Sequence, residues 1–211
     1  MFRKLGDKDI GFYGTAALFI LVFFLYVLLF DNVLITSPVM EPGLKSGDYV
    51  LVGSASYNLS VPIGGRPFEI KKPKRGDIVF FEKEAREDDG AGTSSVLRVV
   101  GVPGDTVEIV DKKVFIDGKP IREPYVTLSD EKLYPGSISE RDNLGPFIVP
   151  ADSYFLLGDR RDVTMDSRFF GFITSGEIKG KVVFIYWSTN PARGIFRDIR
   201  LNRIGFLRSS D

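Results

Sequence analysis

The first thirty residues of the chain contain one long apolar stretch. From Ile10 to Phe30, 21 consecutive residues carry no charge. A helix rises about 1.5 Å per residue, so this stretch reaches about 30 Å, the thickness of a bilayer's hydrocarbon core. Tyr13 and Tyr26 lie near its two ends, where aromatic residues often meet the membrane surface. The pattern therefore predicts a transmembrane helix.

Charges on either side of this stretch indicate how it is oriented. Arg3, Lys4 and Lys8 precede it, and Asp31 follows it. Positive flanks stay on the cytoplasmic side, so we predict a single-pass protein of the cell membrane with its N-terminus in the cytoplasm. The predicted parts are a cytoplasmic tail (1–9), an anchor (10–30) and an extracytoplasmic domain (31–211). The alternative is a cleavable secretory signal, but the apolar run exceeds the roughly 7–15 residues of such a signal and no small-x-small site follows it.

Beyond the anchor the apolar positions change to short runs and period-two alternation, which are typical of β-strands. Turn residues close these runs; Asp117-Gly118, for example, favours a hairpin turn. The predicted strands are Asp48–Val52, Ile78–Phe81, Val96–Val102, Thr106–Val110, Val114–Ile116, Tyr154–Leu157 and Lys181–Trp187. Closely spaced short strands favour a mainly β domain over alternating βαβ units.

Polar stretches separate the predicted strands, and the chain ends in a basic segment. Residues 54–74 indicate an irregular insert, and residues 83–93 and 128–143 indicate surface loops. The tail from Arg193 to Asp211 alternates arginine with apolar residues. Two interpretations stay open for this tail: a half-buried helix, or a basic amphipathic stretch at the lipid surface.

The composition excludes several classes of function. Twenty-eight basic residues balance 28 acidic ones, so the chain does not look like a nucleic-acid binder held by phosphate contacts. It contains neither cysteine nor histidine. Their absence removes thiol nucleophiles, Ser-His and Cys-His mechanisms and metal sites that rely on imidazole. We expect no metal and no cofactor.

Five blocks in the extracytoplasmic part occur in an informative order. Residues 37–52 read Ser-Pro-Val-Met-Glu-Pro-Gly-Leu-Lys-Ser-Gly-Asp-Tyr-Val-Leu-Val. This block resembles the nucleophile segment of the bacterial type I signal peptidases. The further blocks that resemble this family are residues 73–80, 98–105, 158–168 and 176–187. The resemblance implies a signal-peptidase-like β-barrel or β-sheet domain behind a transmembrane helix, and exported pre-proteins as partners.

The resemblance also implies a chemistry that two positions do not provide. The family uses a serine nucleophile and a desolvated lysine base to remove signal peptides at small-x-small sites. Aligned without a gap, the serine falls on Val39 and the lysine on Leu97. Valine has no lone pair to attack with, and leucine cannot accept a proton. The family's auxiliary hydroxyl groups fall on Ser37, which would help to hold the oxyanion, and Thr164, which would orient the lysine.

Other positions in the same blocks match the family's groove and scaffold. These are Met40, Pro42, Arg98, Asp159, Asp166 and Arg168. The last two match a pair that holds the wall of the active site, and a structural ion pair is the expectation here as well. Val96, Val99 and Val100 are expected to surround the base position, and Val39 is expected to contact Leu97.

Three hypotheses about function follow. The chain is an inactive signal peptidase homologue that binds segments of exported proteins, or assists in the assembly of pilus or surface-protein subunits. Alternatively it is a signal peptidase disabled by engineered substitution, or an active peptidase that uses a shifted nucleophile such as Ser37. In every case membrane lipid is an expected partner and nucleic acid is not.

Overall fold

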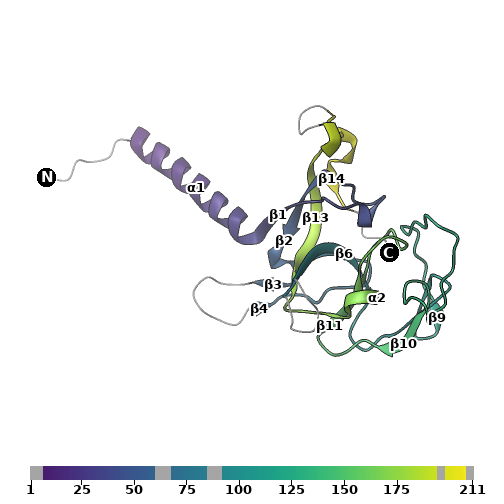
Figure 1. The fold of residues 1–211 in the computed structure, drawn as a ribbon. Helices are drawn as coiled ribbons and strands as arrows, with labels where there is room; N and C mark the ends of the chain where they lie inside the picture. The colour runs from purple at the N-terminus through teal and green to yellow at the C-terminus, as the bar shows by residue number, and fades with distance from the viewer. Residues whose placement is uncertain (1–6, 60–67, 85–91, 194–197, 208–211) are drawn as a thin grey trace.

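A long helix and a β domain make up the computed structural model (Figure 1), which describes residues 7–59, 68–84, 92–193 and 198–207. The helix, α1 (Asp7–Leu29), projects away from the sheets. Its window Phe12–Leu29 has a mean hydropathy of 2.4, and none of it is buried against the domain. By length and composition α1 is able to cross a membrane, and its apolar surface has no cover within the described structure.

The β domain is built around one eight-stranded sheet with the order β1-β2-β13-β5-β6-β11-β12, in which β14 also pairs with β13. Its strands are β1 (Phe30–Leu34), β2 (Asp48–Gly53), β5 (Ile78–Lys83), β6 (Thr93–Gly101), β11 (Ser153–Leu157), β12 (Ile173–Thr174), β13 (Ile178–Ser188) and β14 (Gly205–Phe206). Every pairing in this sheet is antiparallel. The architecture is therefore mainly β, as predicted.

Two smaller sheets complete the domain. One has the order β10-β7-β8-β9 and the other pairs β3 with β4. Their strands are β3 (Asn58–Leu59), β4 (Phe68–Glu69), β7 (Thr106–Val110), β8 (Lys113–Ile116), β9 (Lys119–Pro120) and β10 (Leu144–Ile148). The short helical elements are α2 (Ser167–Phe170) and the 3-10 turns η1 (Pro38–Met40), η2 (Ser54–Ser56), η3 (Pro191–Arg193) and η4 (Leu201–Arg203).

Apolar side chains form two clusters. The larger cluster lies under the eight-stranded sheet and contains Val79, Phe81 and Leu97. The second joins the smaller sheet to β11 and contains Val107 and Phe155. The second half of β6, from Val96 to Gly101, is buried: Val96, Leu97 and Val99 belong to the larger cluster and Val100 to the second.

All seven predicted strands are present, with ends that differ by a few residues. The strands that the pattern did not reveal are short or contain proline and polar residues, as β10 does. The insert 54–74 contains η2 and the β3–β4 pair, and its residues 60–67 lie outside the described structure. The loop 83–93 begins and ends in strand residues, with 85–91 outside the described part, while 128–143 contains no strand or helix.

One expectation about the C-terminal tail is wrong. In the described part of the tail the chain forms the 3-10 turn η4 and the strand β14, not a half-buried helix. Arg200 and Arg203 turn toward Asp48, which is fully buried, and these contacts fix the local path of the backbone. Residues 194–197 and 208–211, with Arg197 and Arg208, lie outside the described residues.

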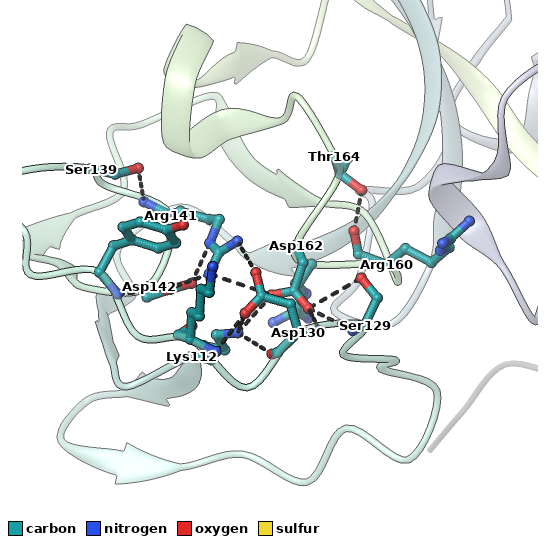
Figure 2. A network of polar contacts seen from close by, with 12 residues as sticks. Lys112, Ser129, Asp130, Ser139, Arg141, Asp142, Arg160, Asp162 and Thr164 are labelled. Atoms are coloured by element: carbon teal, nitrogen blue, oxygen red, sulfur yellow. Dashed lines mark hydrogen bonds and ion pairs between the residues drawn. The ribbon is translucent and has the colours of Figure 1, made fainter.

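Charged side chains hold the loop 128–143 in place (Figure 2). Lys112 lies 2.9 Å from Asp162, and Arg141 lies 3.0 Å from Asp130 and 2.8 Å from Asp142. Arg141 also stacks on the ring of Tyr134 at 4.5 Å. Because the loop has few apolar contacts of its own, this network gives it a defined position beside residues 158–168.

Replacing Arg168 should destabilise the fold. Its guanidinium is buried, donates to Asp166 and also donates to the backbone oxygens of Arg141 and Arg161. Removing it strands the buried carboxylate, so Arg168→Ala should lower the free energy of unfolding by about 3–5 kcal/mol. The measurement is denaturant unfolding of the full chain in detergent, followed by fluorescence of its single tryptophan.

The matched control is Arg193→Ala. Arg193 also pairs with an aspartate, Asp198 at 3.8 Å, but its side chain is 72% exposed. Solvent screening makes such a pair nearly neutral, so the control should change stability by less than about 0.5 kcal/mol. Equal losses in the two variants would contradict the role given to burial.

Candidate functional site

The expected nucleophile position lies on a short 3-10 turn. Ser37 is extended (φ −110°, ψ 146°) and Pro38 opens η1, where its fixed φ suits the first helical position. Val39 is half-buried and packs against the main apolar cluster, while Met40 is fully buried. Pro42 follows on the surface. The turn thus anchors itself through Met40 and presents residue 39 at the edge of the core.

The expected base position lies on β6. Leu97 is fully buried, opposite Val79 of β5, and belongs to the apolar cluster against which Val39 packs. The elements η1 and β6 lie in contact. Val96 and Val99 belong to the same cluster, as expected, but Val100, which follows Val99 on the strand, belongs to the second cluster. The tertiary structure therefore places positions 39 and 97 in one apolar cluster, on two elements that lie in contact.

A cavity of about 170 Å³ adjoins these positions. Its lining comes from two stretches of chain, Val33–Ser37 and Ser94–Val96, together with Val39, Met40 and Phe80. Among the described residues, β1 pairs only with β2, and the Ser94–Val96 part of β6 pairs only with β5. Two strand segments with an unpaired edge therefore line one cavity, whose walls mix apolar side chains with hydroxyl groups. Sequence reasoning missed Phe80, Ser94 and Ser95, since nothing local marks which strand faces a cavity.

Residues 158–164 lie directly behind the nucleophile position. The backbone N–H of Arg160 donates to the carbonyl oxygen of Val39 at 3.0 Å. The hydroxyl of Thr164 donates to the carbonyl of Arg160 at 2.6 Å and lies 3.5 Å from that of Val39. Gly158 is required here, because a Cβ at this position would lie 2.3 Å from the Thr164 hydroxyl oxygen. Thr164 therefore braces the turn instead of orienting a base.

Arg98 and Asp159 form a buried, bidentate ion pair beside Leu97. The two nitrogen–oxygen distances are 2.9 and 2.7 Å, and Arg98 also donates to the carbonyl of Gly76. Its guanidinium stacks 3.8 Å from the ring centre of Tyr125. Burial raises the pKa of the Asp159 carboxyl, and the contact with Arg98 opposes that effect. The pair connects β6 to residues 158–164, which lie behind η1.

Asp166 and Arg168, expected as an ion pair, lie 2.8 Å apart, and both are buried. Asp166 also accepts from the backbone N–H of Gly158 and of Arg168, the second of which caps α2. The Asp166 carboxylate thus holds both ends of the segment 158–168, which lies behind η1. Neither residue requires a catalytic dyad for this role.

A third ion pair, between the fully buried Asp48 and Arg203, had no signal in the local sequence pattern. Asp48 accepts three hydrogen bonds from Arg203, at 3.0, 3.2 and 2.6 Å, and one from the hydroxyl of Ser188 at 2.6 Å. Arg203 also donates to the carbonyl of Gly43. Burial acts to raise the pKa of Asp48, but these hydrogen bonds, with one from the Lys45 backbone, hold it below its usual range. The C-terminal segment thereby fixes the loop that follows η1.

The residues near the cavity offer little to a metal ion. Over the described ranges, no group of three or more aspartate and glutamate side chains is placed to bind one. What the arrangement provides is a cavity of mixed polar and apolar lining beside two strand segments that have an unpaired edge.

Comparison with known proteins identifies the family. The family described as "Signal peptidase, peptidase S26" matches residues 11–187. The chain is 34% identical over 167 residues to a signal peptidase I of Bacillus caldolyticus (77% of this chain, 82% of the relative). It is 31% identical over 182 residues to a signal peptidase IB of Staphylococcus aureus (82% and 86%). A signal peptidase I structure from Enterococcus faecalis is 31% identical over 54% of this chain and 99% of that one, with a TM-score of 0.41.

The chain therefore belongs to the signal peptidase S26 family. Its mainly β domain and its N-terminal apolar helix accord with that membership.

Low pH should destabilise the domain through its paired carboxylates. Burial acts to raise the pKa of Asp162, but bonds from Lys112 and the backbone of Ser129 and Asp130 hold it below its usual range. A lowered pKa stabilises the fold above the unfolded-state value near 4, and this contribution is lost as the pH falls through the folded-state value. Asp162→Asn removes the nearer carboxylate of the buried Lys112, which keeps only Asp130 at 3.9 Å, and should cost about 3 kcal/mol at pH 7.

The difference between parent and Asp162→Asn should shrink as the pH falls below about 4, because the parent's carboxylate is then neutralised. Urea midpoints of both proteins between pH 3 and pH 7 measure this difference. Curves that stay parallel over the whole range would show that the Asp162 carboxylate is not the titrating group.

Restoring a polar dyad should lower stability. Val39 and Leu97 contribute apolar burial, whereas a lysine at 97 would be desolvated. Val39→Ser/Leu97→Lys should therefore be less stable than the parent by on the order of 2–4 kcal/mol. Urea unfolding in detergent measures the difference. A double variant more stable than the parent would contradict the view that Val39 and Leu97 stabilise the fold.

Proposed function

We propose that this protein is a membrane-anchored member of the signal peptidase family that binds segments of exported proteins without cutting them. The observation that carries the proposal is the pair of apolar side chains, Val39 and Leu97, at the positions where the family has its serine and lysine. The surrounding scaffold is intact, with the buried Arg98–Asp159 and Asp166–Arg168 pairs in place. A chain that had lost all function would have lost scaffold residues as well. The intact scaffold therefore favours a protein that still binds its partner.

The cavity supports a mode of binding. An extended segment can add as a strand where a sheet edge is open, with main-chain hydrogen bonds for affinity and side-chain pockets for selectivity. Here Val33–Ser37 and Ser94–Val96 offer such edges on both sides of the cavity. At about 170 Å³ the cavity favours a small or medium apolar side chain on the bound segment. The bound partner is an exported pre-protein, or a pilus or surface-protein subunit.

The anchor belongs to the same proposal. The helix α1 spans the membrane once, its basic N-terminal flank stays in the cytoplasm, and the β domain lies outside the cytoplasm. The three parts are the tail (1–9), the anchor (10–30) and the domain (31–211). This placement puts the cavity on the side of the membrane where exported segments emerge.

An active signal peptidase is the second candidate, because the relatives reported above carry that name. In that case a shifted nucleophile, Ser37, replaces residue 39. Ser37 is half-buried and lines the cavity, but Pro38 restricts the backbone between it and the turn. A disabled, engineered signal peptidase is the third candidate and requires a parent sequence with serine and lysine at positions 39 and 97.

Pre-protein cleavage separates these candidates. The full chain in detergent should leave a pre-protein with a small-x-small site uncut, since Val39 cannot attack and Leu97 cannot accept a proton. The Val39→Ser/Leu97→Lys variant should cleave at that site at least 10²-fold faster, because a nucleophile and a general base are restored. Cleavage by the parent that is abolished by Ser37→Ala would establish the second candidate and overturn the first.

Binding needs its own measurement, because a restored dyad can fail through misfolding. The parent should bind the same uncut pre-protein, and Ser94→Trp should weaken binding at least tenfold by filling the cavity. Ser137→Trp is the matched control: Ser137 is also exposed but lies in the loop 128–143, and the change should leave affinity unaltered. Equal affinities for all three proteins would contradict binding in this cavity.

A further inference from the structure

The cavity beside positions 39 and 97 is lined by uncharged residues of two kinds. Most of its lining residues are apolar, and the others each carry a hydroxyl group. The hydroxyl-bearing residues are Thr36 and Ser37, on the chain that follows β1, and Ser94 and Ser95 on β6. A charged side chain that entered this cavity would lose its water and meet no opposite charge in the lining. The cavity therefore favours an uncharged occupant.

The fold does not use these four hydroxyl groups. Ser37 occupies the N-cap position of η1, where a serine hydroxyl ordinarily accepts from a backbone N–H, but its side chain makes no such bond. Ser94 lies opposite Glu82 of β5, but the Glu82 carboxylate pairs with Lys179 at 3.5 Å. Within the described ranges, none of the four hydroxyls has a hydrogen-bond partner in the chain. Their donors and acceptors are therefore available to a bound molecule.

The hydroxyls also lie where an added strand would pass. Among the described strands, β1 pairs only with β2, and the part of β6 that carries Ser94 and Ser95 pairs only with β5. A segment that adds at such an edge brings its side chains beside those of the neighbouring strand. Threonine and serine side chains of neighbouring strands hydrogen-bond to one another. Two stretches of this chain thus offer hydroxyls to one bound segment.

Displacement of water makes these hydroxyls selective. Thr36 and Ser94 are exposed and Ser37 and Ser95 are half-buried, so water has access to all four in the free protein. A bound segment displaces that water. An apolar side chain then leaves hydroxyls unpaired, which costs more free energy than one formed hydrogen bond gains. A side chain with its own hydroxyl replaces the lost water, so the site prefers it to an apolar side chain of the same shape.

We propose that the exported segment bound in this cavity carries threonine where it enters the cavity, and that the four hydroxyls determine this selectivity. The inference rests on the proposed function and narrows it. The volume of about 170 Å³ sets the size of the bound side chain, and the hydroxyls set its polarity. The apolar part of the lining receives the methyl group of threonine, while the hydroxyls of the lining pair with its hydroxyl. Valine matches threonine in shape but lacks the polar group.

Pre-proteins that differ only at the small-x-small site test this selectivity. Three forms carry alanine, valine or threonine at both small positions, and the alanine form is the pre-protein of the binding measurement above. Each form, with a fluorescent label, is titrated with the full chain in detergent. The threonine form should bind at least about fivefold more tightly than the valine form, as expected for one net hydrogen bond between uncharged groups.

Variants of the chain assign the preference to its residues. Ser94→Ala/Ser95→Ala and Thr36→Val/Ser37→Ala each remove two hydroxyls with little change of shape. Each should lower the threonine-to-valine affinity ratio by about twofold or more. Thr93→Val is the matched control: Thr93 is an exposed hydroxyl residue of β6 that does not line the cavity, and the change should leave the ratio unaltered. Because the ratio compares two ligands on one protein, a partial loss of folded protein does not change it.

The possible results separate this inference from the proposed function. Equal affinities of the threonine and valine forms for the parent overturn the selectivity and leave the binding of exported segments standing. A ratio that persists in both double variants, or that falls equally in Thr93→Val, also overturns it, because the cavity hydroxyls are then not its source. If the parent binds none of the three forms, the proposed function fails and the inference fails with it.

Discussion

Ion pairs between arginine and fully buried aspartate are the constraint on which the rest of the domain depends. Arg98–Asp159 ties β6 to the residues behind η1, Arg168–Asp166 closes the segment 158–168 on itself, and Arg203–Asp48 ties the C-terminal segment to the loop after η1. Because the three aspartates have lost their water, each depends on its arginine. Through these pairs, η1 and β6 are held beside the segment 158–168.

This dependence explains how a scaffold persists when its chemistry changes. The ion pairs stabilise the fold whether residue 39 is serine or valine, because neither Asp159 nor Asp166 contacts a reacting group. By contrast, a lysine at 97 would be a desolvated cation in the apolar cluster, and leucine removes that cost. The apolar pair is therefore the more stable choice, and only selection for cleavage would keep a serine at 39 and a lysine at 97. A protein that binds its partner without cutting it is not under that selection.

The N-terminal helix and the C-terminal segment are the second organising element. The apolar surface of α1 has no cover in the described structure, and its length and composition would let it cross a membrane. At the other end of the chain, the contacts of Arg203 with Asp48 support the loop after η1 and fix the path of the segment on which Leu201 and Phe206 are exposed. One ion pair therefore sets both the position of that loop and the course of the C-terminal segment.

The sequence by itself determined what depends on neighbouring residues: the uncharged stretch Ile10–Phe30, seven of the strands, the turns between them, and the apolar residues at positions 39 and 97. Only the tertiary structure decided that η1 and β6 meet at a cavity and that Val100 faces the second cluster. It also decided that the tail, where a helix was expected, forms η4 and β14. The reason is physical. Periodicity records burial within one element, whereas the path of the tail depends on Asp48, 155 residues from Arg203 along the chain.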